Sequence, residues 1–194
     1  MRTWADVYQN QARESMNALS TIDKDRVEFF INMIKETDGV VFFTGVGKNG
    51  HVAAKTSSTY SSMNIRSFFI DPVEGLHGAM STIRENDIVV AVSKSANTVE
   101  LYYFLKNLKL KTPNTQIVLF HSNSFGKCIE ISDVDIEVKI RNENDKFNII
   151  PINSITIFTI LLQSIGVELS YHNGLTREQF LSNHPGGSIG GVKI

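Results

Sequence analysis

Short apolar runs recur along this chain, and they constrain its fold more than any other feature. Residues 40–43, 88–92 and 117–120 are almost entirely Val, Ile, Leu, Phe and Ala, and segments with a helical pattern separate them. Runs of this length suit strands that are buried on both faces of a sheet. Their alternation with helices predicts an α/β fold, a doubly wound and mostly parallel sheet.

The remaining pattern completes a five-stranded sheet flanked by helices. We expect further strands at 67–70 and at 134–140, the latter an edge strand because its polar and apolar residues alternate. Helices are expected at 4–19, 22–35, 52–62, 99–108, 155–167 and 176–181. A chain of 194 residues favours a single domain. We assign two helices to 1–37 and the α/β core with a tail to 38–194.

Composition excludes several classes of function. A net charge of −1 gives no basic field that would attract nucleic acid or a membrane surface. The single cysteine, Cys128, rules out a disulfide within the chain and argues against a cysteine-based metal site. No signal peptide is expected in residues 1–20, and no segment is expected to be long enough to span a membrane; residues 149–165 come nearest, but polar residues interrupt them. The expected location is therefore the cytoplasm.

Two loops that follow apolar runs contain the residues best suited to binding a ligand. Residues 45–50 read Gly-Val-Gly-Lys-Asn-Gly, and residues 93–98 read Ser-Lys-Ser-Ala-Asn-Thr. A helix that begins in such a loop offers free backbone N–H groups and a partial positive charge to an anion. Lys48 in the first loop and the hydroxyls of Ser93, Ser95 and Thr98 in the second add donors. Both loops begin at carboxyl ends of strands, where doubly wound folds bind ligands, so they predict a site for a phosphorylated small molecule.

Other interpretations of these loops remain open. Gly45, Gly47 and Gly50 also fit the G-x-G-x-x-G pattern of dinucleotide-binding folds, and Asp71 follows at the spacing of a ribose-binding acid. Against this, Lys48 lies inside the loop, two helices precede it, and the second loop has no role in that scheme. The glycines could simply form a tight turn, and one of the three hydroxyls is expected to cap a helix.

Four segments together resemble one known family. They are residues 45–51, Glu-Gly-Leu-His-Gly at 74–78, residues 93–100, and Ser-Asn-His-Pro-Gly-Gly-Ser-Ile-Gly at 182–190. This set is similar to the sugar isomerase (SIS) domain of arabinose-5-phosphate isomerases, with the His-Pro-Gly-Gly tail as its most specific part. The resemblance implies a flavodoxin-like three-layer sandwich. It also implies interconversion of ribulose 5-phosphate and arabinose 5-phosphate through an enediol, which feeds synthesis of Kdo for lipopolysaccharide or capsule.

The resemblance assigns roles to individual residues. It places the family's catalytic positions on Lys48, Glu100, Glu143 and His184, with Glu143 favoured over Glu100 as the base. Binding of substrate and phosphate falls to residues around the two loops: Gly47, Lys48, Asn49, His77, Ser93, Ser95 and Thr98. The resemblance implies no cofactor, no catalytic metal and a homotetramer, in which the tail histidine can come from a neighbouring subunit. A pair of CBS domains, common in the family, is not expected here.

Plainer interpretations accompany these roles. Glu143 lies in a very polar run, residues 141–146, which is typical of a solvated loop. Glu100 could face water, and His77 could be a turn residue. Asn97 and Lys94 replace a glutamate and an asparagine of the family pattern, and Ala79 replaces an aspartate. These departures leave a non-catalytic phosphosugar-binding module as the alternative function, with an NAD-dependent enzyme as the third.

Overall fold

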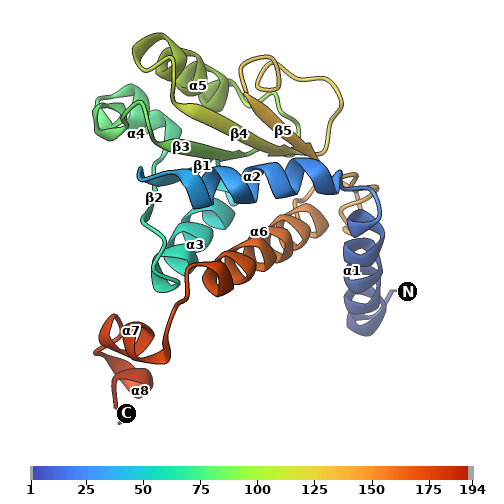
Figure 1. The fold of residues 1–194 in the computed structure, drawn as a ribbon. Coiled ribbons are helices and arrows are strands. Elements are labelled where there is room, and N and C mark those ends of the chain that lie inside the picture. Colours follow the sequence, from blue (N-terminus) through green and yellow to red (C-terminus); the bar gives the residue numbers. More distant parts are fainter. Residues whose placement is uncertain (1, 192–194) are drawn as a thin grey trace.

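A five-stranded parallel sheet forms the centre of the computed structural model, which describes residues 2–191 (Figure 1). The strands are β1 (Val41–Gly45), β2 (Ser67–Phe69), β3 (Ile88–Val92), β4 (Gln116–His121) and β5 (Val134–Glu137). Their order is β2-β1-β3-β4-β5, and every pair is parallel. The predicted doubly wound sheet is confirmed, including the edge position of β5, where buried and half-buried residues alternate.

Helices cover both faces of the sheet and make two hydrophobic cores. The helices are α1 (Trp4–Leu19), α2 (Lys24–Glu36), α3 (Lys48–Ser62), α4 (Pro72–Leu76), α5 (Val99–Lys111), α6 (Asn153–His172), α7 (Arg177–Ser182) and α8 (Gly187–Gly190), with a 3₁₀ turn at Ala79–Thr82. One core joins α2, α3 and α6 to the sheet through residues such as Phe30, Ala53 and Phe158. The other joins α5 to the opposite face through Phe104 and Leu105. The expected three layers are therefore present.

The main departures from the expected boundaries occur at two helix starts. Helix α3 begins at Lys48 rather than at residue 52, because Gly47 adopts a positive φ of 59° and turns the chain at once. Helix α6 begins at Asn153 and extends to His172, beyond both ends of the expected helix. The short helix α4 was not predicted; Asp71 caps it and Pro72 opens it. The early start of α3 is the departure that bears on the candidate site, because it places Lys48 in the first turn.

Helix α6 corrects the expectation that no segment is long enough to span a membrane. Its 20 residues have a mean hydropathy of 1.3, enough by length and composition alone. However, α6 packs against α3, α1 and α2. Its buried side chains include Ile157, Phe158 and Leu162, which belong to the core. We therefore describe α6 as a core helix of the domain.

The sheet topology fixes where a ligand would bind. The chain runs from β1 to β2 on one side and then returns to place β3 on the other side of β1. In sheets of this order the connections leave in opposite directions beyond the carboxyl ends of β1 and β3, and a crevice opens there. Gly45 and Val92, the last residues of these strands, are register partners. The two loops identified from the sequence therefore start side by side.

The C-terminal tail projects away from the sheet. After α6, the chain leads into α7 and α8, which lie apart from the three layers (Figure 1). His184 belongs to this tail, between α7 and α8.

Candidate functional site

The first loop is a tight turn from β1 into α3 that leaves the helix start open. An added Cβ at Gly45 would lie 3.0 Å from the backbone of Asn49 and from the carbonyl oxygen of Val92, and one at Gly50 would lie 2.7 Å from the carbonyl oxygen of Gly45. Gly47 is the N-cap residue, and no side chain caps the helix there. Lys48 is the first residue of α3 and is exposed. The tight-turn interpretation is therefore correct for the glycines, and the turn also presents backbone donors and one cation to an anion.

The second loop leads from β3 into α5, and its hydroxyls lie together. The Ser93 and Thr98 hydroxyl oxygens are 3.0 Å apart, and the Ser95 hydroxyl accepts a hydrogen bond from the Asn97 backbone N–H at 3.2 Å. Thr98 occupies the N-cap position of α5, but its side chain makes no capping bond. The expectation that one hydroxyl caps the helix is wrong in this respect. Two helix starts without side-chain caps therefore follow the adjacent carboxyl ends of β1 and β3, the place where doubly wound sheets bind ligands.

Asn97 has a structural role in the second loop. Its amide nitrogen donates to the carbonyl oxygens of Ser95 and Phe125, at 3.1 and 3.2 Å, and its amide oxygen accepts from the Lys127 N–H at 3.0 Å. These bonds tie the loop to the segment that follows β4. Asn97 therefore holds the loop against the segment that follows β4.

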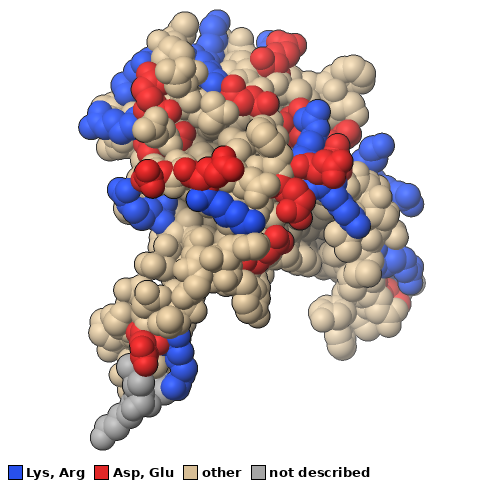
Figure 2. All heavy atoms as spheres, in the orientation of Figure 1, with Lys and Arg blue, Asp and Glu red and all other residues tan. Residues whose placement is uncertain are grey.

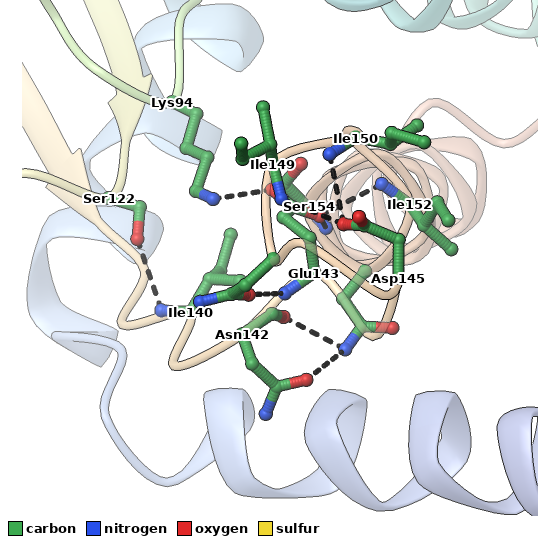
Figure 3. A network of polar contacts seen from close by, with 12 residues as sticks. Lys94, Ser122, Ile140, Asn142, Glu143, Asp145, Ile149, Ile150, Ile152 and Ser154 are labelled. Atoms are coloured by element: carbon green, nitrogen blue, oxygen red, sulfur yellow. Dashed lines mark hydrogen bonds and ion pairs between the residues drawn. The ribbon is translucent and has the colours of Figure 1, made fainter. Parts of the chain in front are cut away.

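Glu143 is buried, and the expectation of a solvated loop is wrong for this residue. Its side chain is 0% exposed, and the Lys94 ammonium nitrogen lies 2.5 Å from Oε1 (Figure 3). Oε2 accepts hydrogen bonds from the backbone N–H groups of Ile152 and Ser154, at 2.8 and 3.0 Å. Glu143 therefore lies at the N-terminal end of α6, where the helix dipole favours a negative charge.

These contacts set the ionisation of Glu143. Burial by itself raises the pKa of the carboxyl, but the bonds from Lys94 and from the start of α6 outweigh burial and hold the pKa below its usual value. Glu143 is therefore a carboxylate at neutral pH. Glu100, the other candidate base, lies in the first turn of α5 and is exposed.

Asp71 is already used by the fold. Its carboxylate caps α4 by accepting from the N–H groups of Val73 and Glu74, at 2.8 and 3.3 Å. This bonding weakens the dinucleotide interpretation, in which Asp71 would hold a ribose. His77 is exposed and is the C-cap residue of α4, the short helix that follows β2. It therefore lies beyond the carboxyl end of β2, at the same edge of the sheet as the two loops.

His184 lies apart from the other candidate residues. Its Nδ1 is 2.7 Å from the carbonyl oxygen of Phe180, and its Nε2 is 3.3 Å from the hydroxyl of Ser62. Ser62 is the last residue of α3, whereas Lys48 is the first. A helix of 15 residues is about 20 Å long. Within one chain, therefore, Lys48 and the second loop lie at the sheet edge and His184 lies at the far end of α3.

Lys94 is the residue that sequence reasoning did not assign to the site. It lies between Ser93 and Ser95, and the sequence left open whether its charge was simply solvated. The partner, Glu143, is 49 residues away in the chain, so no local pattern could reveal the pair.

The comparisons with known proteins place the chain in a family. The model of the SIS domain matches residues 33–167, and the chain belongs to this family. The arabinose 5-phosphate isomerase KdsD of Pseudomonas aeruginosa is 31% identical over 152 residues, which are 78% of this chain and 46% of that protein. The arabinose 5-phosphate isomerase KpsF of Escherichia coli is 28% identical over 180 residues, 93% of this chain and 54% of that protein. The chain thus spans about half the length of these relatives.

Solved structures agree on the fold. The Escherichia coli CFT073 protein c3406 in complex with A5P has a TM-score of 0.85 at 24% identity, with 95% of this chain and 100% of that chain covered. A putative phosphosugar isomerase involved in capsule formation from Bacteroides fragilis has a TM-score of 0.87 at 24% identity, with 95% and 99% covered. The three-layer sandwich is therefore the fold of SIS domains.

Proposed function

We propose that this chain is a phosphosugar aldose–ketose isomerase that interconverts ribulose 5-phosphate and arabinose 5-phosphate. The observation that carries the proposal is that two helix starts without side-chain caps, at Gly47 and Thr98, follow the adjacent carboxyl ends of β1 and β3. Such a place suits a phosphate monoester. The similarity to arabinose 5-phosphate isomerases supports the particular substrate pair.

Phosphate binding falls to the two loops. Backbone N–H groups at Gly47, Lys48 and Asn49 and the hydroxyls of Ser93, Ser95 and Thr98 would donate to the phosphate oxygens. The Lys48 ammonium adds a charge at the same helix start, and His77 would contact the sugar from the end of β2. We expect no cofactor in this reaction.

The isomerisation needs a base, a cation and a ring-opening group. A base removes the proton from C1 of the ketose, the electron pair forms the C1–C2 double bond, and the C2 oxygen takes up negative charge. Return of the proton to C2 and transfer of the O1 proton to the C2 oxygen then yield the aldose. Glu143 and Glu100 are the two candidate bases. Lys48 would stabilise the negative charge of the phosphate or of the enediolate. His184 would open the sugar ring or move the proton between the oxygens on C1 and C2.

The position of His184 suggests that the complete site forms between copies of the chain. The α7–α8 tail projects from the body, and His184 cannot reach the Lys48 of its own chain from the far end of α3. A second copy of the chain would supply the histidine. We therefore propose a homo-oligomer, a tetramer by resemblance, in which one subunit's tail reaches the site of another.

An apolar groove between α1 and α6 gives such a second copy a place to dock. The groove has a volume of about 510 Å³ and is lined by residues that include Tyr8, Met16, Leu19 and Ile160. Tyr8 is 72% exposed and Trp4 is 84% exposed. In the view of Figure 2, acidic and basic side chains intermix over the upper body, whereas the surface below α6, between α1 and the tail, is largely uncharged. Burial of such a surface favours association.

The alternative is a phosphosugar-binding module without catalysis. The separation of His184 from Lys48 favours it if the chain acts as a monomer, because a single copy then holds the binding loops without the histidine. The fold does not distinguish the two proposals, because a cytoplasmic isomerase and a cytoplasmic phosphosugar sensor would both have it.

An isomerase assay across five- and six-carbon sugar phosphates tests the proposal. We expect ribulose 5-phosphate to be converted to arabinose 5-phosphate without added metal or nucleotide, and to raise the melting temperature by mass action. Stabilisation by phosphosugars without turnover of any would instead support the binding module. Stabilisation by NAD but not by phosphosugars would support the dinucleotide interpretation.

A further inference from the structure

The two members of the Lys94–Glu143 ion pair are unequally exposed. The Glu143 side chain is 0% exposed, whereas the Lys94 side chain is 36% exposed. Lys94 also belongs to the second loop, directly after Ser93 at the end of β3. A ligand that reaches the second loop from solvent can therefore contact Lys94, whereas the Glu143 side chain is covered.

Glu143 is fully engaged before any ligand binds. Oε1 accepts from Lys94, and Oε2 accepts from two backbone N–H groups at the start of α6. The Asn148 amide oxygen also accepts from the Glu143 N–H, at 2.6 Å, and fixes the backbone. Such a carboxylate has its charge balanced inside the protein and exposes no oxygen to the crevice.

The Lys94 ammonium, in contrast, has donors to spare. An ammonium carries three N–H donors. In the part of the chain that the structure describes, its one hydrogen-bond partner is Glu143 Oε1. Two donors remain for a group outside the protein, and the buried anion holds them in place.

Resting on the function proposed above, we propose that Lys94 is a catalytic cation of this site and that Glu143 is the residue that positions it. The ammonium donates to the sugar oxygen that becomes negative in the enediolate. The two helix starts would bind the phosphate, and the Lys94 side chain extends from the second loop toward Glu143 at the start of α6 (Figure 3). A cation that is fixed in advance stabilises developing charge without reorganisation at the moment of reaction. Under this assignment, Glu100 is the base.

A binding experiment tests the proposal without turnover. Calorimetry compares erythronate 4-phosphate, whose carboxylate carbon takes the place of C2 and puts a charged oxygen where the enediolate has one, with erythritol 4-phosphate, which carries a neutral hydroxyl there. We expect the wild-type protein to bind the acid about tenfold more tightly, as one charge-assisted bond implies. Lys94→Met should remove this preference and leave the affinity for the alditol phosphate within about twofold.

The matched control is Lys139→Met, which removes an exposed lysine two residues after β5, at the same edge of the sheet. It should keep the preference for the acid. The inference is overturned if Lys94→Met keeps that preference. It is also overturned if Lys94→Met lowers the affinity for both compounds equally, which would make Lys94 a phosphate ligand. Failure of the wild-type protein to bind either compound would instead contradict the proposed function, and with it this inference.

A double-mutant cycle on turnover separates the two residues. We expect Lys94→Met to lower kcat by about 100-fold with a smaller change in KM, and Lys94→Arg to keep part of the rate. If Glu143 acts through Lys94, Lys94→Met combined with Glu143→Gln should be no slower than Lys94→Met alone, within about twofold. Losses that multiply in the double variant would mean that Glu143 contacts the substrate itself, and would overturn the assignment. Urea unfolding of each variant checks that the fold is retained.

Discussion

His184 and Lys48 lie at opposite ends of helix α3. The imidazole of His184 contacts Ser62, the last residue of the helix, and Lys48 is its first residue. The separation of about 20 Å follows from the length of a 15-residue helix, so no rotamer change of either side chain can join them. A site that uses both residues has to take them from different chains.

This geometry predicts complementation between inactive variants. Lys48→Ala and His184→Ala should each be nearly inactive alone when ribulose 5-phosphate is kept below its KM for the wild-type protein. Mixed oligomers formed after co-expression should regain turnover, up to about a quarter of the wild-type rate, because some sites then receive an intact Lys48 from one chain and an intact His184 from another. The isomerase assay on the purified mixture measures this. Co-expression of Lys48→Ala with Glu100→Gln, two residues of the same chain's loops, is the control and should stay inactive.

Removal of the Lys48 charge should weaken phosphate binding. Because Lys48 opens α3 beside uncapped backbone N–H groups, its ammonium adds a charge-assisted bond to the same anion. We expect Lys48→Ala to lower the affinity for ribulose 5-phosphate by about 10- to 100-fold in calorimetry. Lys139→Ala should bind as the wild-type protein does. Unchanged affinity in Lys48→Ala would place the phosphate elsewhere.

The ionisation of Glu143 should make stability depend on acid pH. Its pKa in the folded protein lies below the usual value of a glutamate carboxyl, so its carboxylate stabilises the fold fully above about pH 5. That stabilisation decreases as the pH falls toward and through the pKa of the folded state. Glu143→Gln should cost about 1 to 3 kcal/mol at pH 7, and the difference from the wild-type protein should shrink below pH 4. Urea unfolding at the two pH values measures this, and a difference independent of pH would contradict it.

The contact between α6 and α3 should not tolerate a methyl group at Gly166. A Cβ there would lie 2.5 Å from the ring of Tyr60, whose hydroxyl donates to the carbonyl oxygen of Leu162. We expect Gly166→Ala to destabilise the protein by about 1 to 3 kcal/mol, although alanine is the better helix former. The neighbouring exposed Val167→Ala should change the free energy of unfolding by less than about 1 kcal/mol. A more stable Gly166→Ala variant would show that Tyr60 moves aside.

Much of the fold could be predicted from the sequence. The apolar run 88–92 coincides with β3, and the helix expected at 4–19 coincides with α1. These elements were readable because burial on both faces of a sheet and one-sided burial of a helix leave their periods in the residues. The start of α3 was placed four residues late, because a positive φ at Gly47 leaves no trace in the hydrophobic pattern.

The candidate site was predictable only in part. The two glycine- and hydroxyl-rich loops could be predicted because their glycines, hydroxyls and lysine lie within a few residues of each other. The order of the strands then places the starts of both loops side by side. Glu143 showed the opposite case, because its polar neighbours indicate solvent and the structure buries it. Lys94 could be recognised as a site residue only from its ion pair with Glu143 in the structure.

By itself, the sequence determined the alternation of strands and helices, the positions of the two glycine- and hydroxyl-rich loops and the family to which the chain belongs. These are local properties, set by side-chain periodicity and backbone donors within a few residues. The tertiary structure alone decided that Glu143 is a buried anion paired with Lys94 and that His184 lies a helix length from Lys48. Burial and charge pairing join residues that are distant in the chain, so their energies depend on how the whole chain packs.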